Sequence, residues 1–381
     1  MWEEKKLGDV IKLEYGKPLP ENKRKEDGVY PAYGANGVKC KTDEYYYDKA
    51  SIIVGRKGSA GEITLTESRF WPLDVTYFVT FDERKYNLLF LFYCLKNLKI
   101  QKLAKGVKPG INRNDVYALK LLFPPLSEQE RIVAILDEAF EEIDTAVANT
   151  EKNLANAREL FESYLNNVFT QKGDGWEEKS IKDIADVKGG KRVPKGYKLL
   201  SETTDYPYIS VKDFSDSGTV TNETVRFVSK EIYEHIRRYT ISSDDLYISI
   251  AGTIGKSGII PKNLDGANLT ENACKLVFGS KTFNRFVYYI TLSQSFKDQT
   301  LSRTRTSAQP KLALDRLKDI KIPLPRLSEQ ERIVAILDDL AAEIKTLEPI
   351  YQQKLDALAE LKQSILQKAF SGELTKQDIA A

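Results

Sequence analysis

The chain has 381 residues, of which 41% are hydrophobic and 29% are charged, a composition typical of a folded protein with more than one domain rather than of a disordered chain. No run of about 18 apolar residues occurs, and the N-terminal segment lacks the apolar stretch of a signal peptide, so we expect no membrane span and a cytoplasmic location. The three cysteines lie far apart, which predicts reduced thiols, and the single histidine, His235, argues against a histidine-based catalytic or metal site.

The net charge of +2 conceals an alternation along the chain. Residues 1–123 carry 22 basic and 16 acidic residues, a net charge of +6, and residues 173–322 carry 24 and 19, a net charge of +5. Residues 124–172 carry 4 and 10, a net charge of −6, and residues 323–381 carry 7 and 10, a net charge of −3. Basic surfaces attract polyanions and acidic ones repel them, so we predict that a polyanion binds to the two longer segments.

The predicted elements alternate in chain order between short strands, one helix and a very long helix. In the first half, strands are expected near residues 51–54 and 76–79, a helix over 87–103, and a long helix from Ser127. The second half gives the same order. Strands are expected at 246–250 and 275–278, a helix over 283–299, and a long helix from Ser328.

An internal duplication underlies this order. The twelve residues from Leu126 to Asp137 recur without change from Leu327 to Asp338, a match that chance does not explain. The segment starts also correspond, because Trp-Glu-Glu-Lys occurs at residues 2–5 and again at 176–179, and each is followed by a Gly-Lys pair. The duplication predicts four segments, which are 1–123, 124–172, 173–322 and 323–381.

The two long helices carry apolar residues at alternating steps of three and four, which predicts a coiled coil of about five heptads. Ser-x-x-Glu at 127–130 and 328–331 predicts a capping box at each start. Pro349 predicts a kink or a local break in the second helix. Because each helix starts or ends close to the second globular segment, antiparallel pairing is the easier connection. We therefore expect an α+β protein in which an antiparallel coiled coil separates two globular domains related by a pseudo-twofold internal repeat.

Sequence signatures of catalysis are weak. Gly252-Thr253-Ile254-Gly255-Lys256-Ser257 resembles a phosphate-binding loop, but such a loop needs glycine where Ile250 stands. Phe123-Pro124-Pro125-Leu126 shares only its prolines with the signature of amino-methyltransferases. We therefore predict that the glycines of these loops serve tight turns beside strands, and that the chain itself holds no catalytic residue and no metal.

Nucleic-acid binding is the chemistry that the remaining residues favour. Arginine can bind guanine through two hydrogen bonds, glutamine can bind adenine, and lysines and short hydroxyls suit phosphates. The candidates for DNA binding in the first globular segment are Lys17, Tyr33, Asn36, Arg56, Lys57, Lys105, Lys108, Asn112 and Arg113. Those in the second are Lys191, Arg192, Lys195, Lys212, Lys256, Arg303, Arg305, Ser307, Gln309 and Lys311.

The paired blocks at residues 124–132 and 325–333 resemble the conserved regions of the specificity (S) subunit of type I restriction-modification enzymes, as do Gly173–Trp176 and the ending at 361–374. This resemblance implies two target-recognition domains, each reading one half of a bipartite site in double-stranded DNA. It implies that the coiled coil sets their spacing and docks two modification (M) subunits, which restriction (R) subunits join in the full complex. It also implies that S-adenosylmethionine, ATP and magnesium bind to those partners and not to this chain.

Two other classes of protein stay open on the sequence. One is a self-contained nuclease or methyltransferase whose site the sequence does not reveal, which would turn over substrate without partners. The other is a coiled-coil adaptor for proteins, whose basic segments would show no salt-sensitive DNA binding.

Overall fold

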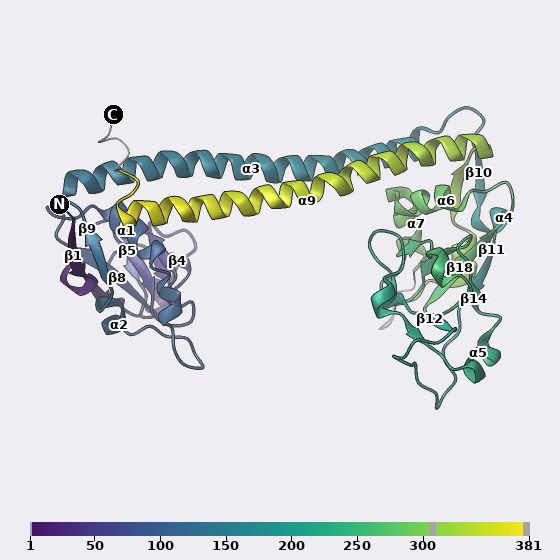
Figure 1. Ribbon diagram of the computed structural model, residues 1–381, viewed down its shortest axis with the longest axis horizontal. Coiled ribbons are helices and arrows are strands. Elements are labelled where there is room, and N and C mark those ends of the chain that lie inside the picture. Colours follow the sequence, from purple (N-terminus) through teal and green to yellow (C-terminus); the bar gives the residue numbers. More distant parts are fainter. Residues whose placement is uncertain (1, 305–309, 376–381) are drawn as a thin grey trace. The chain divides into compact units, whose positions relative to one another are not determined.

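The computed structural model describes residues 2–304 and 310–375, which fall into two compact units (Figure 1). Unit 1 comprises Met1–Glu151 and Tyr351–Ala381, and unit 2 comprises Lys152–Ile350. This grouping cuts across the four segments expected from the sequence, because each long helix contributes one part of its length to each unit. No helix among the described residues has both the length and the apolar character needed to cross a membrane.

Unit 1 is built on two small sheets and one strand pair. The main sheet is antiparallel throughout and has the order β2 (Ile11–Tyr15), β8 (Thr76–Phe81), β5 (Ile52–Gly55), β6 (Ile63–Leu65). The second sheet has the order β4 (Gly37–Thr42), β3 (Tyr30–Gly34), β7 (Trp71–Pro72), with β7 parallel to β3. Strand β1 (Glu3–Lys6) pairs with β9 (Lys120–Phe123), and the short helices are α1 (Leu88–Asn97) and α2 (Arg113–Tyr117).

Unit 2 repeats this plan with different details. Its main sheet has the order β11 (Ala185–Gly189), β18 (Ala273–Phe278), β15 (Leu246–Ser249), β16 (Ser257–Gly258), again antiparallel. Its second sheet has the order β13 (Arg226–Phe227), β12 (Pro207–Ile209), β17 (Ala267–Leu269), β14 (Thr240–Ile241). Strand β10 (Glu177–Ser180) pairs with β19 (Lys321–Leu324), and the short helices are α4 (Ile181–Ile184), α5 (Lys230–Ile236), α6 (Asn284–Leu292), α7 (Gln294–Arg303) and α8 (Leu314–Lys318). The predicted α+β class and the internal repeat are therefore confirmed.

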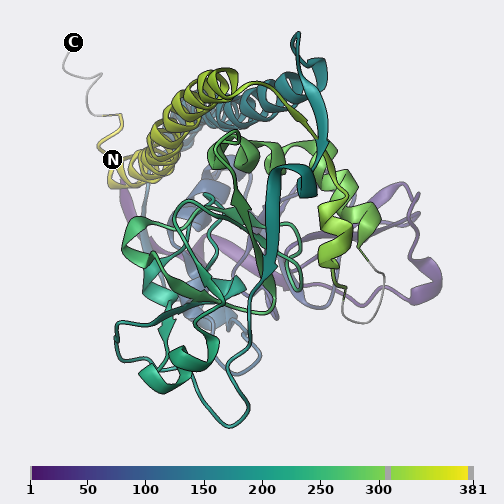
Figure 2. The same cartoon turned by 90° about the vertical axis from the view of Figure 1, so that its right-hand side faces the viewer.

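The predicted helix over 283–299 is wrong in detail, because two helices replace it. Helix α6 ends at Leu292, and the extended backbone of Ser293 then caps α7, whose Phe296 N–H donates to the Ser293 hydroxyl. Serine competes for local backbone hydrogen bonds and so favours a cap over a helix interior. In unit 2, α6 lies between the sheet and the long helices (Figure 2), and its Phe286 packs against Phe169 of the first long helix.

The long helices are α3 (Leu126–Gln171) and α9 (Leu327–Ser371). The predicted capping boxes are wrong, because Ser127 and Ser328 are the second residues of these helices and not their caps. The carbonyl of Pro125 accepts the first turn's N–H of Glu128 at 3.0 Å, and that of Arg326 accepts the N–H of Glu329 at 3.0 Å. The helices thus start earlier than the capping motif predicts.

Pro349 does not break α9, which continues through it. Proline has no N–H, so the carbonyl of Lys345 loses its helical partner. Both residues are exposed. Water can therefore satisfy that carbonyl, which explains why the helix tolerates the proline.

The long helices run antiparallel where they meet within each unit. In unit 1, the Lys362 ammonium pairs with Asp144 at 2.7 Å, and in unit 2, Arg158 Nε pairs with Glu348 at 2.8 Å. Arg158 follows Asp144 by 14 residues along α3, whereas Glu348 precedes Lys362 by 14 residues along α9. Equal steps in opposite directions along the two helices are the pattern of antiparallel pairing, as predicted.

A buried glutamine joins α3 to the globular part of unit 1. The Gln129 side chain is fully buried. Its Nε2 donates to the carbonyls of Lys85 (3.0 Å) and Pro124 (2.9 Å), and its Oε1 accepts the N–H of Asn87 (2.9 Å). All three partners are backbone groups, and Asn87 caps α1. The glutamine therefore fixes the start of α3 against the start of α1.

The same arrangement of hydrogen bonds around a buried glutamine occurs in unit 2, at the start of α9. Gln330, also fully buried, donates to the carbonyls of Lys281 (3.1 Å) and Pro325 (2.8 Å) and accepts the N–H of Phe283 (2.8 Å). Buried polar groups must find hydrogen-bond partners. This requirement gives a physical reason for the glutamine at the same position of the two repeated blocks.

Candidate nucleic-acid interface

The two Gly-Lys pairs form the same turn at the end of the first strand of each main sheet. In unit 1, a Cβ on Gly16 would lie 2.0 Å from the carbonyl oxygen of Leu73, and in unit 2, a Cβ on Gly190 would lie 2.0 Å from that of Thr270. No side chain fits at either distance, so glycine is required for the close approach of two backbone segments.

This turn presents a lysine over a tyrosine ring in both units. The Lys17 ammonium lies 4.8 Å from the ring centre of Tyr46, and the Lys191 ammonium lies 5.7 Å from that of Tyr239. Such contacts are worth roughly 0.5–1 kcal/mol at exposed sites. They hold each cation at the edge of its sheet while leaving the charge open to an anion.

The glycine-rich loops lie at this same edge in both units. The loop at 58–61 connects β5 to β6, and its Gly61 N–H donates to the carbonyl of Gly55 at 2.8 Å. The loop at 252–255 connects β15 to β16, and its Gly255 N–H donates to that of Ser249 at 2.9 Å. A strand, not a helix, follows each loop, so neither has the form of a phosphate-binding loop, and both are tight turns as predicted.

In unit 1, the loop before α2 joins the same edge. The N–H of Gly58 donates to the carbonyl of Pro109 at 3.1 Å, and the N–H of Ile111 donates to that of Arg56 at 3.0 Å. These bonds gather candidates that are far apart in the sequence at one sheet edge. They are Lys17, Arg56, Lys57, Lys105, Lys108, Asn112 and Arg113.

Arginine and tyrosine side chains stack at the centre of this edge. The Arg56 guanidinium lies 5.3 Å from the ring centre of Tyr15 and 6.0 Å from that of Tyr77, and Arg113 lies over Tyr15 at 5.2 Å. Burial, followed by the neighbouring Tyr15 hydroxyl, raises the pKa of Tyr77 to about 12. The Tyr77 ring thus stays neutral at physiological pH.

The other candidates of unit 1 have different surroundings. Lys57 and Lys108 are exposed, whereas Lys105 pairs with Asp115 at 3.0 Å. Asn112 caps α2 by accepting the N–H of Asn114, a structural role that the sequence analysis did not assign to it. Asn36 is exposed in the turn between β3 and β4. The carbonyl of its neighbour Ala35 lies close to Gly55, where β5 ends at the edge of the main sheet.

Tyr33 does not belong to a surface. Its ring is 7% exposed and packs edge-on against Phe70 at 5.7 Å in a buried aromatic cluster. The end of β3 is buried on both faces, because Ala32, Tyr33 and Gly34 are all buried and Ala32 and Tyr33 belong to different apolar clusters. A nucleic acid therefore cannot stack on this ring in the described conformation.

In unit 2, the corresponding edge is less basic. Ile250, which is 4% exposed, and Ala251 stand where unit 1 has Arg56 and Lys57. Lys311 lies beside Ala251, in the position that Gly110 holds beside Lys57 in unit 1. The two units therefore share one backbone arrangement but offer different side chains.

Several candidates of unit 2 already have partners. Arg192 pairs with Glu271 at 2.5 Å, and Lys256 pairs with Asp216 at 2.8 Å. Arg303, the last residue of α7, donates to the carbonyl of Gln299 at 3.3 Å. Two further candidates, Lys195 and Lys212, are exposed, and three lie outside the described residues: Arg305, Ser307 and Gln309.

Sequence reasoning named the cations and missed the tyrosines beneath them, which are Tyr15, Tyr46, Tyr77 and Tyr239. Tyr15 immediately precedes the Gly-Lys pair, so its place was visible in the sequence. The other three come from distant segments, and only the fold brings them to the edge.

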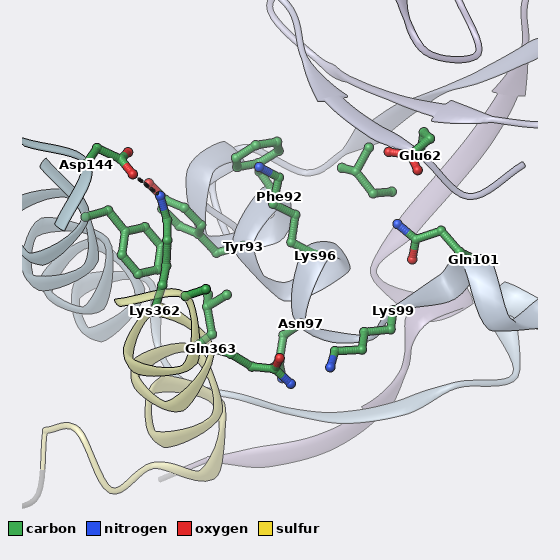
Figure 3. A pocket seen from close by; sticks show the side chains of 14 residues that line it. Glu62, Phe92, Tyr93, Lys96, Asn97, Lys99, Gln101, Asp144, Lys362 and Gln363 are labelled. Atoms are coloured by element: carbon green, nitrogen blue, oxygen red, sulfur yellow. Dashed lines mark hydrogen bonds and ion pairs between the residues drawn. The ribbon is translucent and has the colours of Figure 1, made fainter. Parts of the chain in front are cut away.

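Unit 1 also has a groove of about 560 Å³ between α1, α3, α9 and β6 (Figure 3). Its walls include Phe92, Tyr93 and Phe140. The Lys362 ammonium lies over the Phe140 ring at 4.8 Å, and that of Lys96 lies over the Phe92 ring at 4.5 Å. Burial, and then repulsion from Lys362, lowers the pKa of Lys96.

The equivalent place in unit 2 has different side chains. Phe161 occupies the helix position that corresponds to Lys362, and its ring lies 6.4 Å from that of Tyr289. Arg285 pairs with Asp338 at 2.7 Å beside it, and the Tyr289 hydroxyl donates to the same carboxylate. The repeat therefore does not copy the side chains that line the groove of unit 1.

Among the residues that the structure describes, no group of three or more histidine, cysteine, aspartate or glutamate side chains could hold a metal ion.

Together, the fold and the site define a class of protein in which two copies of one α+β module, each with a cationic sheet edge, share a pair of long antiparallel helices. Residues 1–154 and 173–353 match the family described as "Type I restriction modification DNA specificity domain". The chain belongs to this family.

Similar proteins agree with this assignment. The chain is 26% identical to the type I restriction enzyme MjaVIII specificity subunit of Methanocaldococcus jannaschii, over 99% of this chain and 94% of that protein. It is 25% identical to the EcoBI specificity subunit of Escherichia coli, over 94% of this chain and 82% of that protein.

Solved structures show the same fold. A chain from a structural study of complex assembly and conformational transition of the type I R-M system matches with a TM-score of 0.77 at 19% identity, covering 98% of both chains. The HsdS subunit from Thermoanaerobacter tengcongensis matches with a TM-score of 0.61 at 20% identity, covering 98% of this chain and 97% of that one.

Proposed function

We propose that each unit reads one half of a bipartite site in double-stranded DNA. One observation carries this proposal: the same turn holds a lysine over a tyrosine at the same sheet edge of both units, but the neighbouring side chains differ. A shared scaffold suits a shared task, which is contact with the DNA backbone. Different neighbours suit different base sequences, because base contacts and not phosphate contacts specify sequence.

The long helices would set the spacing between the half-sites and dock two modification subunits. Both segments that contain them are acidic, so they repel DNA and leave the basic edges to bind it. Their antiparallel pairing within each unit supports this role. The aromatic and lysine-lined groove of unit 1 suits contact with a protein, because aromatic anchors are enriched at interfaces.

Catalysis would belong to the partners in a cytoplasmic complex. The relatives are named as specificity subunits, which supports a recognition role without turnover for this chain. S-adenosylmethionine, ATP and magnesium would accordingly bind to the modification subunits and to the restriction subunits of the full complex.

The spacing part of the proposal is tested by deleting one matched heptad from both helices, between the two interhelical ion pairs. Seven residues span about 10.5 Å of helix, which is close to three base pairs of duplex at 3.4 Å each. We expect the complex with its partner subunits to methylate sites with a spacer about three base pairs shorter and unchanged half-site sequences. An unchanged spacer would show that the helices do not measure it.

The DNA-binding part is tested by titrating duplex DNA with the complex at several salt concentrations. Removing one phosphate contact, as in Lys17→Ala, is expected to reduce the salt slope by about one unit. The matched control is Lys6→Ala, a lysine of β1 at the strand pair beside the long helices. Binding that does not depend on salt would instead favour a protein adaptor.

A further inference from the structure

The backbone of Arg56 is fixed on both sides where β5 ends. Its N–H donates to the carbonyl of Val75 at 2.9 Å, and its carbonyl accepts the N–H of Ile111 at 3.0 Å. The side chain therefore leaves the sheet edge from an anchored position, unlike one on a free loop.

The guanidinium of Arg56 is also fixed. It lies over the rings of Tyr15 and Tyr77, and its Nη2 donates to the carbonyl of Asp74 at 2.7 Å. Its Nε is buried without a hydrogen-bond partner. The Nε side thus faces the protein, and Nη1 together with the second N–H of Nη2 is the part left for a ligand.

A fixed planar fork suits a base better than a phosphate. Arginine presents two parallel donors, which match the O6 and N7 acceptors of guanine in the major groove. Holding the fork before binding avoids the entropic cost of ordering a flexible side chain. The exposed lysines nearby, Lys57 and Lys108, carry compact charges that suit phosphates.

We infer that Arg56 reads a guanine in the half-site bound by unit 1, through both acceptors of the base, with Tyr15 as the residue that positions it. This inference rests on the proposed function and adds the base and the residue that reads it. Unit 2 has Ile250 in the equivalent position, so it reads its half-site by other means.

The experiment uses the complex of the full chain with its modification subunits, after its methylated sites in a host have given the target sequence. Each guanine of the target is replaced in turn by 7-deazaguanine, which keeps base pairing and O6 but removes the N7 acceptor. We expect one position, in the half-site of unit 1, at which this change weakens binding about 10-fold, part of the discrimination that a two-bond contact supplies.

A variant shows whether Arg56 is the cause. Arg56→Lys keeps the charge but loses the fork, so 7-deazaguanine at that position should no longer matter, while guanines of the other half-site keep their effects. Tyr15→Leu should reduce the effect and Tyr15→Phe should retain it, because only the ring is needed for stacking. The matched control Lys57→Ala should weaken binding alike for guanine and 7-deazaguanine.

The inference is overturned if no guanine of that half-site is sensitive, or if the sensitivity persists in Arg56→Lys. If Arg56 had a purely structural role, Arg56→Lys would weaken binding to every DNA sequence equally. Failure of the proposed function looks different, because the complex would then show no preference for any target sequence, modified or not.

Discussion

The buried glutamines offer the sharpest test of how the repeat stabilises each unit. Replacing Gln129 by methionine keeps the volume of the side chain and removes three hydrogen bonds with buried or partly buried backbone groups. Leaving a buried donor or acceptor unsatisfied costs about 1–3 kcal/mol per group. With some relief from water at the partly buried groups, we expect a loss of about 3 kcal/mol, a large share of the roughly 5–15 kcal/mol that stabilises a typical protein.

Hydrogen exchange can measure this loss in one unit at a time. A change of about 3 kcal/mol corresponds to roughly 100-fold faster exchange of protected amides, here in α1 and β9. Gln330→Met should accelerate exchange by the same factor in α6 and β19 of unit 2. The control is Glu130→Gln, a substitution at the exposed residue next to Gln129, which should change the exchange rates of neither unit. The reasoning is refuted if Gln129→Met accelerates exchange by less than about 5-fold, or if it affects both units equally.

Three further outcomes follow from local geometry. Burial raises the pKa of both Cys94 and Cys274 to about 12. A thiol reagent at pH 8 should therefore label the half-buried Cys40 quickly and the other two cysteines only after unfolding. Rapid labelling of all three thiols would contradict this. Gly16→Ala forces a Cβ against a backbone oxygen, so we expect a loss of about 2 kcal/mol or more by urea unfolding, and a neutral result would show that the turn can relax. Lys362→Ala removes an exposed ion pair and a ring contact, so the free energy of unfolding should fall by no more than about 1 kcal/mol. A lower affinity for modification subunits in a pull-down titration would indicate that the groove is part of their contact.

The sequence by itself determined the parts of this protein that depend on repetition and periodicity. The twelve identical residues located the two equivalent places at which a long helix starts from a globular part. The spacing of apolar residues predicted two long antiparallel helices, because helix faces follow a fixed period. The two Gly-Lys pairs were also visible in the sequence, because each follows one copy of the repeated Trp-Glu-Glu-Lys segment. The sequence missed the starts of the helices, where Pro125 and not Ser127 provides the cap, and it could not tell that α9 passes Pro349.

Only the tertiary structure decided which of the basic residues meet. Arg56 and Arg113 are separated by more than fifty residues, and backbone hydrogen bonds between two loops bring both to Tyr15. Tyr33 looked equally suitable in the sequence and is buried. Charge and aromaticity are properties of a residue, whereas exposure and proximity depend on contacts between distant segments, and a single sequence does not contain those contacts explicitly.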